Sequence, residues 1–149
     1  MSRYLKDFTP GQIYKTARKR MELADIKRFA AEFDPQPFHL DDAAAKTSMF
    51  GALAASGWHT AAATMRLLVD SEFKAANGLI GAGFDELKWP KPVYPGDELR
   101  VEAEVLEVRA TKSRPEMGFV KFRMMTLNQR DEPVQVGVCN LVVPTGSSR

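Results

Sequence analysis

The segment from residue 99 to 108, LRVEAEVLEV, alternates apolar and charged side chains. Leu99, Val101, Ala103 and Val105 fall on one face of an extended chain, and the residues between them are Arg100, Glu102 and Glu104. An alternation with a period of two predicts a strand with one buried and one solvated face, which is typical of antiparallel sheets. The chain must therefore supply another element to cover the buried face of that sheet.

Three further segments of the second half are also predicted to be strands. They are LIGAGFDELKW at 79–89, FVKFRMMTL at 119–127 and PVQVGVCNLVV at 133–143. Turn-forming residues separate them, with Pro95-Gly96-Asp97 before the second strand and NQRDEP between the last two. A looser alternation in IYKTARKR, residues 13–20, offers one more strand.

The first half supplies the helices. Helical spacing of apolar residues predicts a helix over 21–33 that ends before Pro35, and Asp41 and Asp42 suit the start of a short helix to Lys46. A longer helix begins at Ser56, a candidate N-cap. Its expected apolar stripe, which would face the sheet, is Trp58, Ala61, Ala62, Met65, Leu68 and Val69. The sequence thus predicts one α+β domain over 1–149, an antiparallel sheet wrapped around a long central helix, with TGSSR at 145–149 as a disordered tail.

Composition excludes several function classes. The net charge is +2 and the basic residues are scattered, so nothing indicates nucleic-acid binding. No apolar run approaches membrane-spanning length, and the single cysteine, Cys139, cannot form an internal disulfide. We therefore expect a cytoplasmic protein. Only two histidines are present, and their spacing does not suggest a metal site, so none is expected.

The stretch DPQPFH, residues 34–39, holds the most suggestive acid and base pair of the chain, Asp34 and His39. They lie five positions apart, which is too far for contact along a strand and slightly off the i,i+4 position of a helix. Pro35 and Pro37 disfavour both regular structures and should fix a turn. We expect the turn to hold both side chains on the same side of one cavity.

The order of these elements, the DPQPFH stretch, the ASGW start of the long helix and the later WPKPVYPGDEL resemble the MaoC-type (R)-specific enoyl-CoA hydratases of the hot-dog fold. The resemblance covers roughly residues 8–143. Asp34, Pro37 and His39 match the family pattern, and Gln36 stands where that pattern has Asn. Gly57 matches the glycine that opens the central helix, and Ser56 stands where the family often has His.

The resemblance implies a lyase of fatty acid metabolism that adds water reversibly to trans-2-enoyl-CoA or, in reverse, dehydrates 3-hydroxyacyl-CoA. Asp34 and His39 would share one water as base and acid, and the start of the helix at Gly57 would stabilise the thioester oxyanion. No cofactor is expected, because the CoA thioester is the substrate. A homodimer paired edge to edge, or a dimer of dimers, is also implied, with no membrane and no nucleic-acid partner.

Simpler interpretations exist for each residue. Asp34 could end a helix, His39 could be a loop histidine, and Gly57 could serve close packing. His59 is expected to be a residue of the helix start near the pocket edge, and Cys139 to be buried and inert.

Two other functions stay open: an acyl-CoA thioesterase and a non-catalytic acyl-CoA-binding protein. Hot-dog thioesterases usually carry their carboxylate on the central helix, but residues 57–69 contain no Asp or Glu. The intact pair of Asp34 and His39 argues against a protein without catalytic activity.

Overall fold

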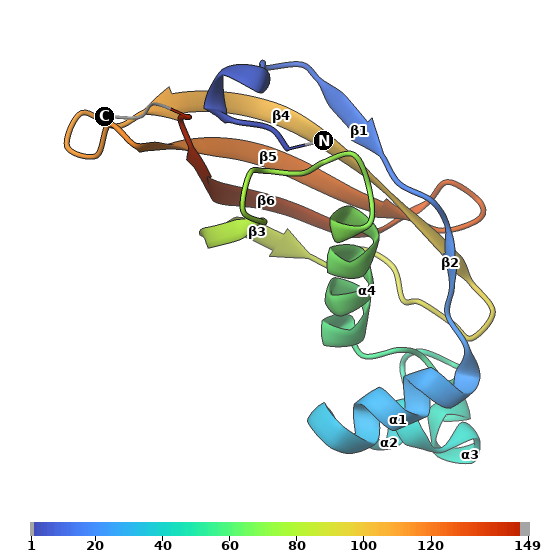
Figure 1. Ribbon diagram of the computed structural model, residues 1–149. Coiled ribbons are helices and arrows are strands. Elements are labelled where there is room, and N and C mark those ends of the chain that lie inside the picture. The colour runs from blue at the N-terminus through green and yellow to red at the C-terminus, as the bar shows by residue number, and fades with distance from the viewer. Residues whose placement is uncertain (1, 147–149) are drawn as a thin grey trace.

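The computed structural model describes residues 2–146, and its main element is an antiparallel sheet (Figure 1). The strand order is β1-β4-β5-β6-β3, and β2 also pairs with β4. The strands are β1 (Ile13–Lys15), β2 (Lys19–Arg20), β3 (Ile80–Lys88), β4 (Glu98–Ala110), β5 (Met117–Leu127) and β6 (Pro133–Pro144). The four strands predicted in the second half are confirmed. The strand predicted over 13–20 is divided into β1 and β2.

The alternation of β4 divides the sheet into two chemically distinct faces. Leu99, Val101, Ala103 and Val105 are fully buried on the inner face. A β-bulge lies between Val105 and Glu107, so the pattern shifts by one residue and Glu107 continues the charged outer face. This arrangement confirms the predicted sheet with one apolar face.

The inner face is covered by α4 (Gly57–Val69), which lies beneath the sheet in Figure 1. The buried side chains of α4 are those of His59, Thr60, Ala63, Thr64, Leu67 and Leu68. The predicted apolar stripe is therefore wrong except at Leu68, because Trp58, Met65 and Val69 are exposed. The hydroxyl of Thr64 lies 2.7 Å from that of Thr126 on β5, so hydrogen bonding sets part of the helix face that meets the sheet.

The remaining helices are η1 (Leu5–Asp7), α1 (Leu23–Phe33), α2 (Pro37–Leu40) and α3 (Asp42–Lys46). The last three form a cluster at the end of α4 that points away from the sheet (Figure 1). As predicted, α1 ends just before Asp34. The turn after it is not fully irregular, however, because Pro37 opens the helical turn α2, where its missing N–H costs nothing.

The C-terminal end of the described chain is held to the sheet region. The backbone N–H of Thr145 donates to the carbonyl of Glu116 at 2.9 Å, so the predicted disordered tail does not begin at this residue. The rest of that tail, at 147–149, lies outside the described residues. Within residues 2–146, no helix has both the length and the apolar character needed to cross a membrane.

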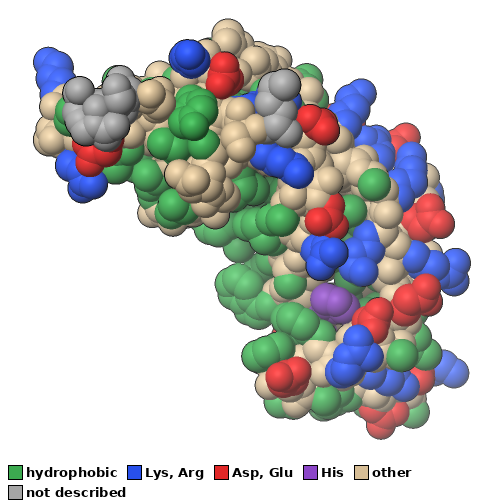
Figure 2. All heavy atoms as spheres, in the orientation of Figure 1, with side chains coloured by type: hydrophobic (Ala, Val, Ile, Leu, Met, Phe, Trp, Pro, Cys, Tyr) green, Lys and Arg blue, Asp and Glu red, His purple; other side chains and the backbone are tan. Residues whose placement is uncertain are grey.

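Hydrophobic surface gathers on the concave side of the protein, between the sheet and α4 (Figure 2). Exposed apolar side chains come from α4, with Trp58, Met65 and Val69, and from β3, with Ile80 and Phe84. Because β3 is also the last strand of the sheet, the protomer leaves an apolar helix face and a strand edge uncovered.

Candidate active site

Asp34 follows the last residue of α1, and its carboxylate is held on two sides. One carboxylate oxygen, Oδ2, accepts a hydrogen bond from Ser56 Oγ at 2.7 Å and lies 3.4 Å from His39 Nε2. The other, Oδ1, accepts from the side-chain amide of Gln36. With 17% of its side chain exposed, Asp34 is an anchored carboxylate at the edge of solvent.

His39 lies on α2 and is buried, with 5% of its side chain exposed. Its Nδ1 is 2.6 Å from the backbone carbonyl oxygen of Ala54. A carbonyl only accepts hydrogen bonds, so Nδ1 must carry a proton. In the neutral imidazole, Nε2 is then the basic nitrogen, and it faces Asp34.

The pKa of Asp34 is decided by opposing effects. Burial raises it, but the hydrogen bonds from Ser56 and Gln36 and the nearby His39 lower it, and the pKa ends below its ordinary value. The carboxylate is therefore ionised at neutral pH. When the imidazole of His39 is neutral, its Nε2 and the ionised Oδ2 are both acceptors, and a single water molecule can donate one hydrogen bond to each.

A cavity of about 360 Å³ adjoins this pair. His39 and Gln36 line it, and both contact Asp34, which does not line it itself. The other lining residues are Phe38, Phe50, Ala55, Gly57, Thr60, Trp89, Lys91, Pro92 and Val93. The cavity is mostly apolar, with a few polar groups at one side, which is the usual make-up of a small-molecule site.

Gly57 is the first residue of α4 and brings the helix start to the same cavity. Ser56 caps this helix, because its Oγ accepts from the N–H of Trp58 at 3.2 Å. A Cβ at position 57 would lie 2.8 Å from the indole ring of Trp89. Trp89 fills the space that a side chain at position 57 would need, so close packing, the simpler interpretation of Gly57, accounts for the glycine.

The structure thus places His39 and Gly57, two of the predicted site residues, in the lining of one cavity, and the third, Asp34, beside His39 without lining the cavity itself. Three further residues of the site were not predicted as such. Ser56 was expected only to cap the helix, and Gln36 and Trp89 were noted only within their motifs. No sequence pattern links Ser56 to Asp34 or Trp89 to Gly57, because these contacts join distant segments.

His59 does not lie near the edge of this cavity, contrary to expectation. It is buried, stacks on Phe29 with 4.7 Å between ring centroids, and lines a separate cavity with charged residues that include Lys19 and Arg20. Burial and the charges of Lys19 and Arg28 outweigh the opposing effect of Asp25, so the pKa of His59 is lowered. Burial also raises the pKa of the Cys139 thiol, which keeps it protonated.

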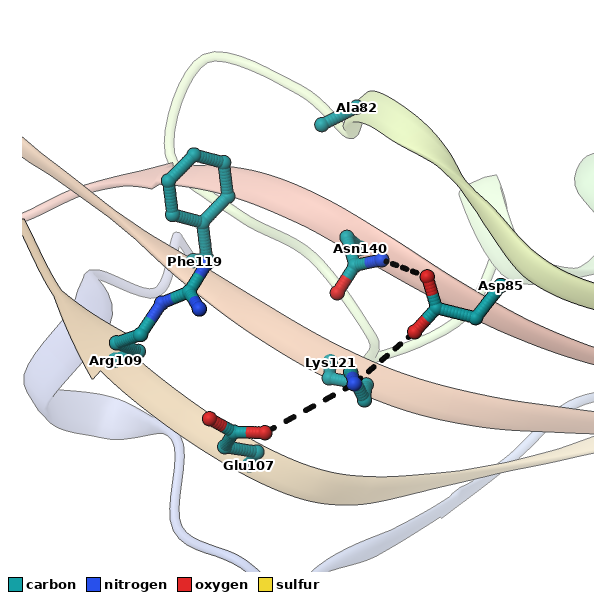
Figure 3. A pocket seen from close by; sticks show the side chains of 7 residues that line it. All are labelled: Ala82, Asp85, Glu107, Arg109, Phe119, Lys121 and Asn140. Atoms are coloured by element: carbon teal, nitrogen blue, oxygen red, sulfur yellow. Dashed lines mark hydrogen bonds and ion pairs between the residues drawn. The ribbon is translucent and has the colours of Figure 1, made fainter.

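A third cavity, of about 320 Å³, lies on the outer face of the sheet (Figure 3). Its lysine, Lys121, is 3.0 Å from Asp85 and 3.9 Å from Glu107, and the guanidinium of Arg109 lies over the ring of Phe119. These charges neutralise one another, as expected of a solvated sheet surface. Across residues 2–146, no three His, Cys, Asp or Glu side chains are grouped to hold a metal ion.

Comparison with known proteins identifies the family. The model of the MaoC like domain matches residues 7–121, a range that contains Asp34, His39 and Gly57. The chain belongs to this family. The MaoC-like dehydratase of Rhodospirillum rubrum is 55% identical in sequence, with a TM-score of 0.93 over 96% of this chain and 97% of that one. The hot-dog fold predicted from the sequence is therefore confirmed.

Two other relatives are informative. An uncharacterized protein of Bacillus subtilis, YdeM, is 34% identical over 93% of this chain and 97% of its own length. An (R)-hydratase from A. caviae involved in PHA biosynthesis is 26% identical, with a TM-score of 0.74 over 93% of this chain and 99% of that one. The relatives thus include both a hydratase and a protein of unknown activity.

Proposed function

We propose that this MaoC-like protein adds water to the double bond of a trans-2-enoyl-CoA to give the (R)-3-hydroxyacyl-CoA, and catalyses the reverse dehydration. The observation that carries the proposal is the placement of Asp34 Oδ2 at 3.4 Å from Nε2 of His39, a histidine that lines an apolar cavity. One water can donate to both of them, and its oxygen lone pair is then free to attack a carbon atom held in the cavity.

The reaction needs a base, an acid and a site for negative charge. One member of the pair accepts a proton from the water as its oxygen bonds to the β-carbon. The electrons of the double bond move towards the thioester oxygen, and a proton is then delivered to the α-carbon. His39 suits proton transfer because its Nδ1–H is fixed to Ala54, which leaves Nε2 as the exchanging atom. Both hydrogens of the water end in the product, one in the new hydroxyl and one on the α-carbon.

The negative charge on the thioester oxygen would be stabilised at the start of α4. The first N–H groups of a helix have no partner within the helix, and the helix dipole favours negative charge there. The N–H of Trp58 is already bonded to Ser56 Oγ, so the N–H of Gly57 is the donor proposed for the oxyanion.

The relatives support the choice of substrate. The A. caviae protein is an (R)-hydratase, and a mesaconyl-CoA hydratase of Cereibacter sphaeroides is 40% identical over 39% of this chain, although that match spans 17% of its own length. The substrate class that we propose is a CoA thioester with a conjugated double bond, in line with the name of the mesaconyl-CoA hydratase and with the paired acceptors of the site.

Crotonyl-CoA tests the reaction directly. The purified protein should remove the absorbance of the conjugated double bond without releasing free thiol. Release of thiol would mean that water attacks the carbonyl carbon, which would replace the hydratase by a thioesterase.

Asp34→Asn and His39→Asn should each lower turnover by about 10²-fold or more, because each removes a proton-transfer group. Both variants should still bind butyryl-CoA, which has no double bond to hydrate. Asp42→Asn is the matched control, since Asp42 lies on α3 and pairs with Lys27 at the surface. Near-normal turnover in both site variants would show that the turn is structural and that the assignment is wrong.

We also propose a homodimer in which two sheets join through β3 and the exposed face of α4 is covered. The support is the combination of an open strand edge and exposed Met65, Val69 and Phe84. Sedimentation at micromolar concentration tests it, and a monomer there would contradict it.

A further inference from the structure

Trp89 is the residue after β3, and its indole ring lies in the site cavity against the start of α4. The residue is 39% exposed, and three atoms of its ring lie 2.8–3.1 Å from where a Cβ of Gly57 would be. The indole therefore lies against the start of α4, beside the N–H proposed to bind the thioester oxygen. It lines the same cavity as His39.

The ring of Trp89 is fixed from behind by the protein core. Its Nε1–H donates to Oε1 of Gln135 at 2.8 Å. Gln135 lies on β6, is fully buried, and contacts Thr64 Oγ1 at 3.4 Å through its own amide nitrogen. Thr64 in turn bonds to Thr126. Moving the ring would leave the buried side-chain oxygen Oε1 of Gln135 without a hydrogen-bond donor, which would destabilise the folded protein.

A thioester oxygen held by the N–H of Gly57 would lie about 3 Å from that nitrogen. The first carbons of the acyl group must then lie close to the indole ring, because the ring already contacts Gly57. A longer chain that continues in the direction of the ring has to pass along it or displace it. Phe38 and Phe50, whose ring centroids are 5.1 Å apart, line the same cavity.

We propose that Trp89 is a specificity-determining residue that limits the acyl group to short chains, and that Gln135 is the positioning residue that holds it. The substrate class is then short-chain trans-2-enoyl thioesters. This inference rests on the proposed hydratase function for its kinetic test, while its binding test is independent of catalysis.

The test compares a short and a long substrate in Trp89→Ala. Relative to the unmodified protein, the ratio of kcat/KM for trans-2-octenoyl-CoA to that for crotonyl-CoA should rise by about tenfold or more, since even one methylene changes discrimination by that order. Phe119→Ala is the matched control, because it removes an aromatic ring from the outer face of the sheet. The control should leave the ratio unchanged, and an unchanged ratio in Trp89→Ala would overturn the inference.

Gln135→Leu tests the positioning role. It removes the acceptor of Trp89 and should shift the ratio in the same direction by a smaller factor. In the Trp89→Ala background the same change should have no further effect on the ratio, because Gln135 acts through the ring. A purely structural role would alter the ratio equally in both backgrounds. Trp89 emission, measured in Trp58→Phe protein, should also change when Gln135 is replaced.

Binding of saturated acyl-CoAs separates this inference from the proposed reaction. Trp89→Ala should strengthen the binding of octanoyl-CoA relative to butyryl-CoA by about tenfold. If that shift occurs but crotonyl-CoA is not hydrated, the hydratase assignment fails and the role of Trp89 stands. If crotonyl-CoA is hydrated and neither ratio shifts, the role of Trp89 is wrong. Failure to bind either acyl-CoA would overturn both.

Discussion

Ser56→Ala should weaken the fold and change the acid side of the pH profile together, because one hydroxyl serves both. Ser56 Oγ accepts from the N–H of Trp58 at 3.2 Å and donates to Asp34 Oδ2 at 2.7 Å. It therefore caps α4 and ties this helix to the carboxylate that follows α1. The side chain is fully buried, so alanine fits the same space.

The size of the effect follows from these two hydrogen bonds. Loss of a serine N-cap costs about 1 kcal/mol. A hydrogen bond to a charged group contributes about 1.5–3 kcal/mol, and the lower end applies because water can reach a carboxylate that is 17% exposed. The sum is a loss of about 2–3 kcal/mol in the free energy of unfolding, or a decrease of roughly 4–12 °C in Tm for a domain of this size.

The pH effect has a definite sign. The lowered pKa of Asp34 contributes stability that is present above the pKa of the unfolded chain and is lost as pH falls through the folded value. Removing the bond from Ser56 raises the folded pKa, so this contribution shrinks. If turnover needs the ionised carboxylate, the acid limb of its pH profile should move to higher pH in Ser56→Ala.

Urea unfolding at neutral pH and turnover of crotonyl-CoA against pH are the two measurements. A double-mutant cycle with Asp34→Ala isolates the bond between the two side chains, and its coupling energy should be about 1–2 kcal/mol. A stability change below about 0.5 kcal/mol, of the kind seen at ordinary surface positions, together with an unshifted acid limb, would refute the reasoning.

Three further predictions concern other parts of the protein. Gly57→Ala should cost about 1–2 kcal/mol in chemical unfolding, because the new Cβ overpacks against the ring of Trp89; equal or higher stability would contradict this contact. The lowered pKa of His59 means that the unfolded chain binds more protons near pH 6.5, so stability should fall as pH drops below that value. This loss should be smaller in His59→Phe, which keeps the stacking on Phe29, and an identical pH dependence of Tm in both proteins would argue against it. Met65→Asp, on the exposed face of α4, should convert the proposed homodimer to monomers in sedimentation; an unchanged assembly would place the interface elsewhere.

The sheet was predictable from the sequence because each strand carries its own signal. Alternation in β4 follows directly from one face meeting water, and Ser56 marks the start of α4 with a local hydrogen bond. The positions of the apolar residues alone did not predict which face of α4 is buried. Thr64 is buried because the hydroxyl of Thr126 on β5 satisfies it, while Met65 is exposed in the protomer despite being apolar.

For the candidate site, the sequence indicated Asp34, His39 and Gly57, but neither the roles of Ser56, Gln36 and Trp89 nor the geometry. Pro35 and Pro37 indicated a turn between Asp34 and His39. The family resemblance suggested that these two residues activate a water molecule. The bond from His39 Nδ1 to a backbone carbonyl fixes the basic nitrogen, yet every residue offers such a carbonyl, so the sequence does not indicate Ala54 as the partner. The contact of Trp89 with Gly57 depends on how the sheet and α4 pack, which no local pattern encodes.

The buried hydroxyls of Thr64 and Thr126 have a consequence for the position of α4 along the sheet. A slide of one residue would shift the helix by about 1.5 Å along its axis and turn it by about 100°. Thr64 would then leave Thr126 and Gln135, and each unpaired buried group would cost about 1–3 kcal/mol. A purely apolar contact would resist such sliding far less. These hydrogen bonds therefore fix the position of α4 along the sheet. They thereby also fix the place of Gly57, at the start of the helix, relative to His39.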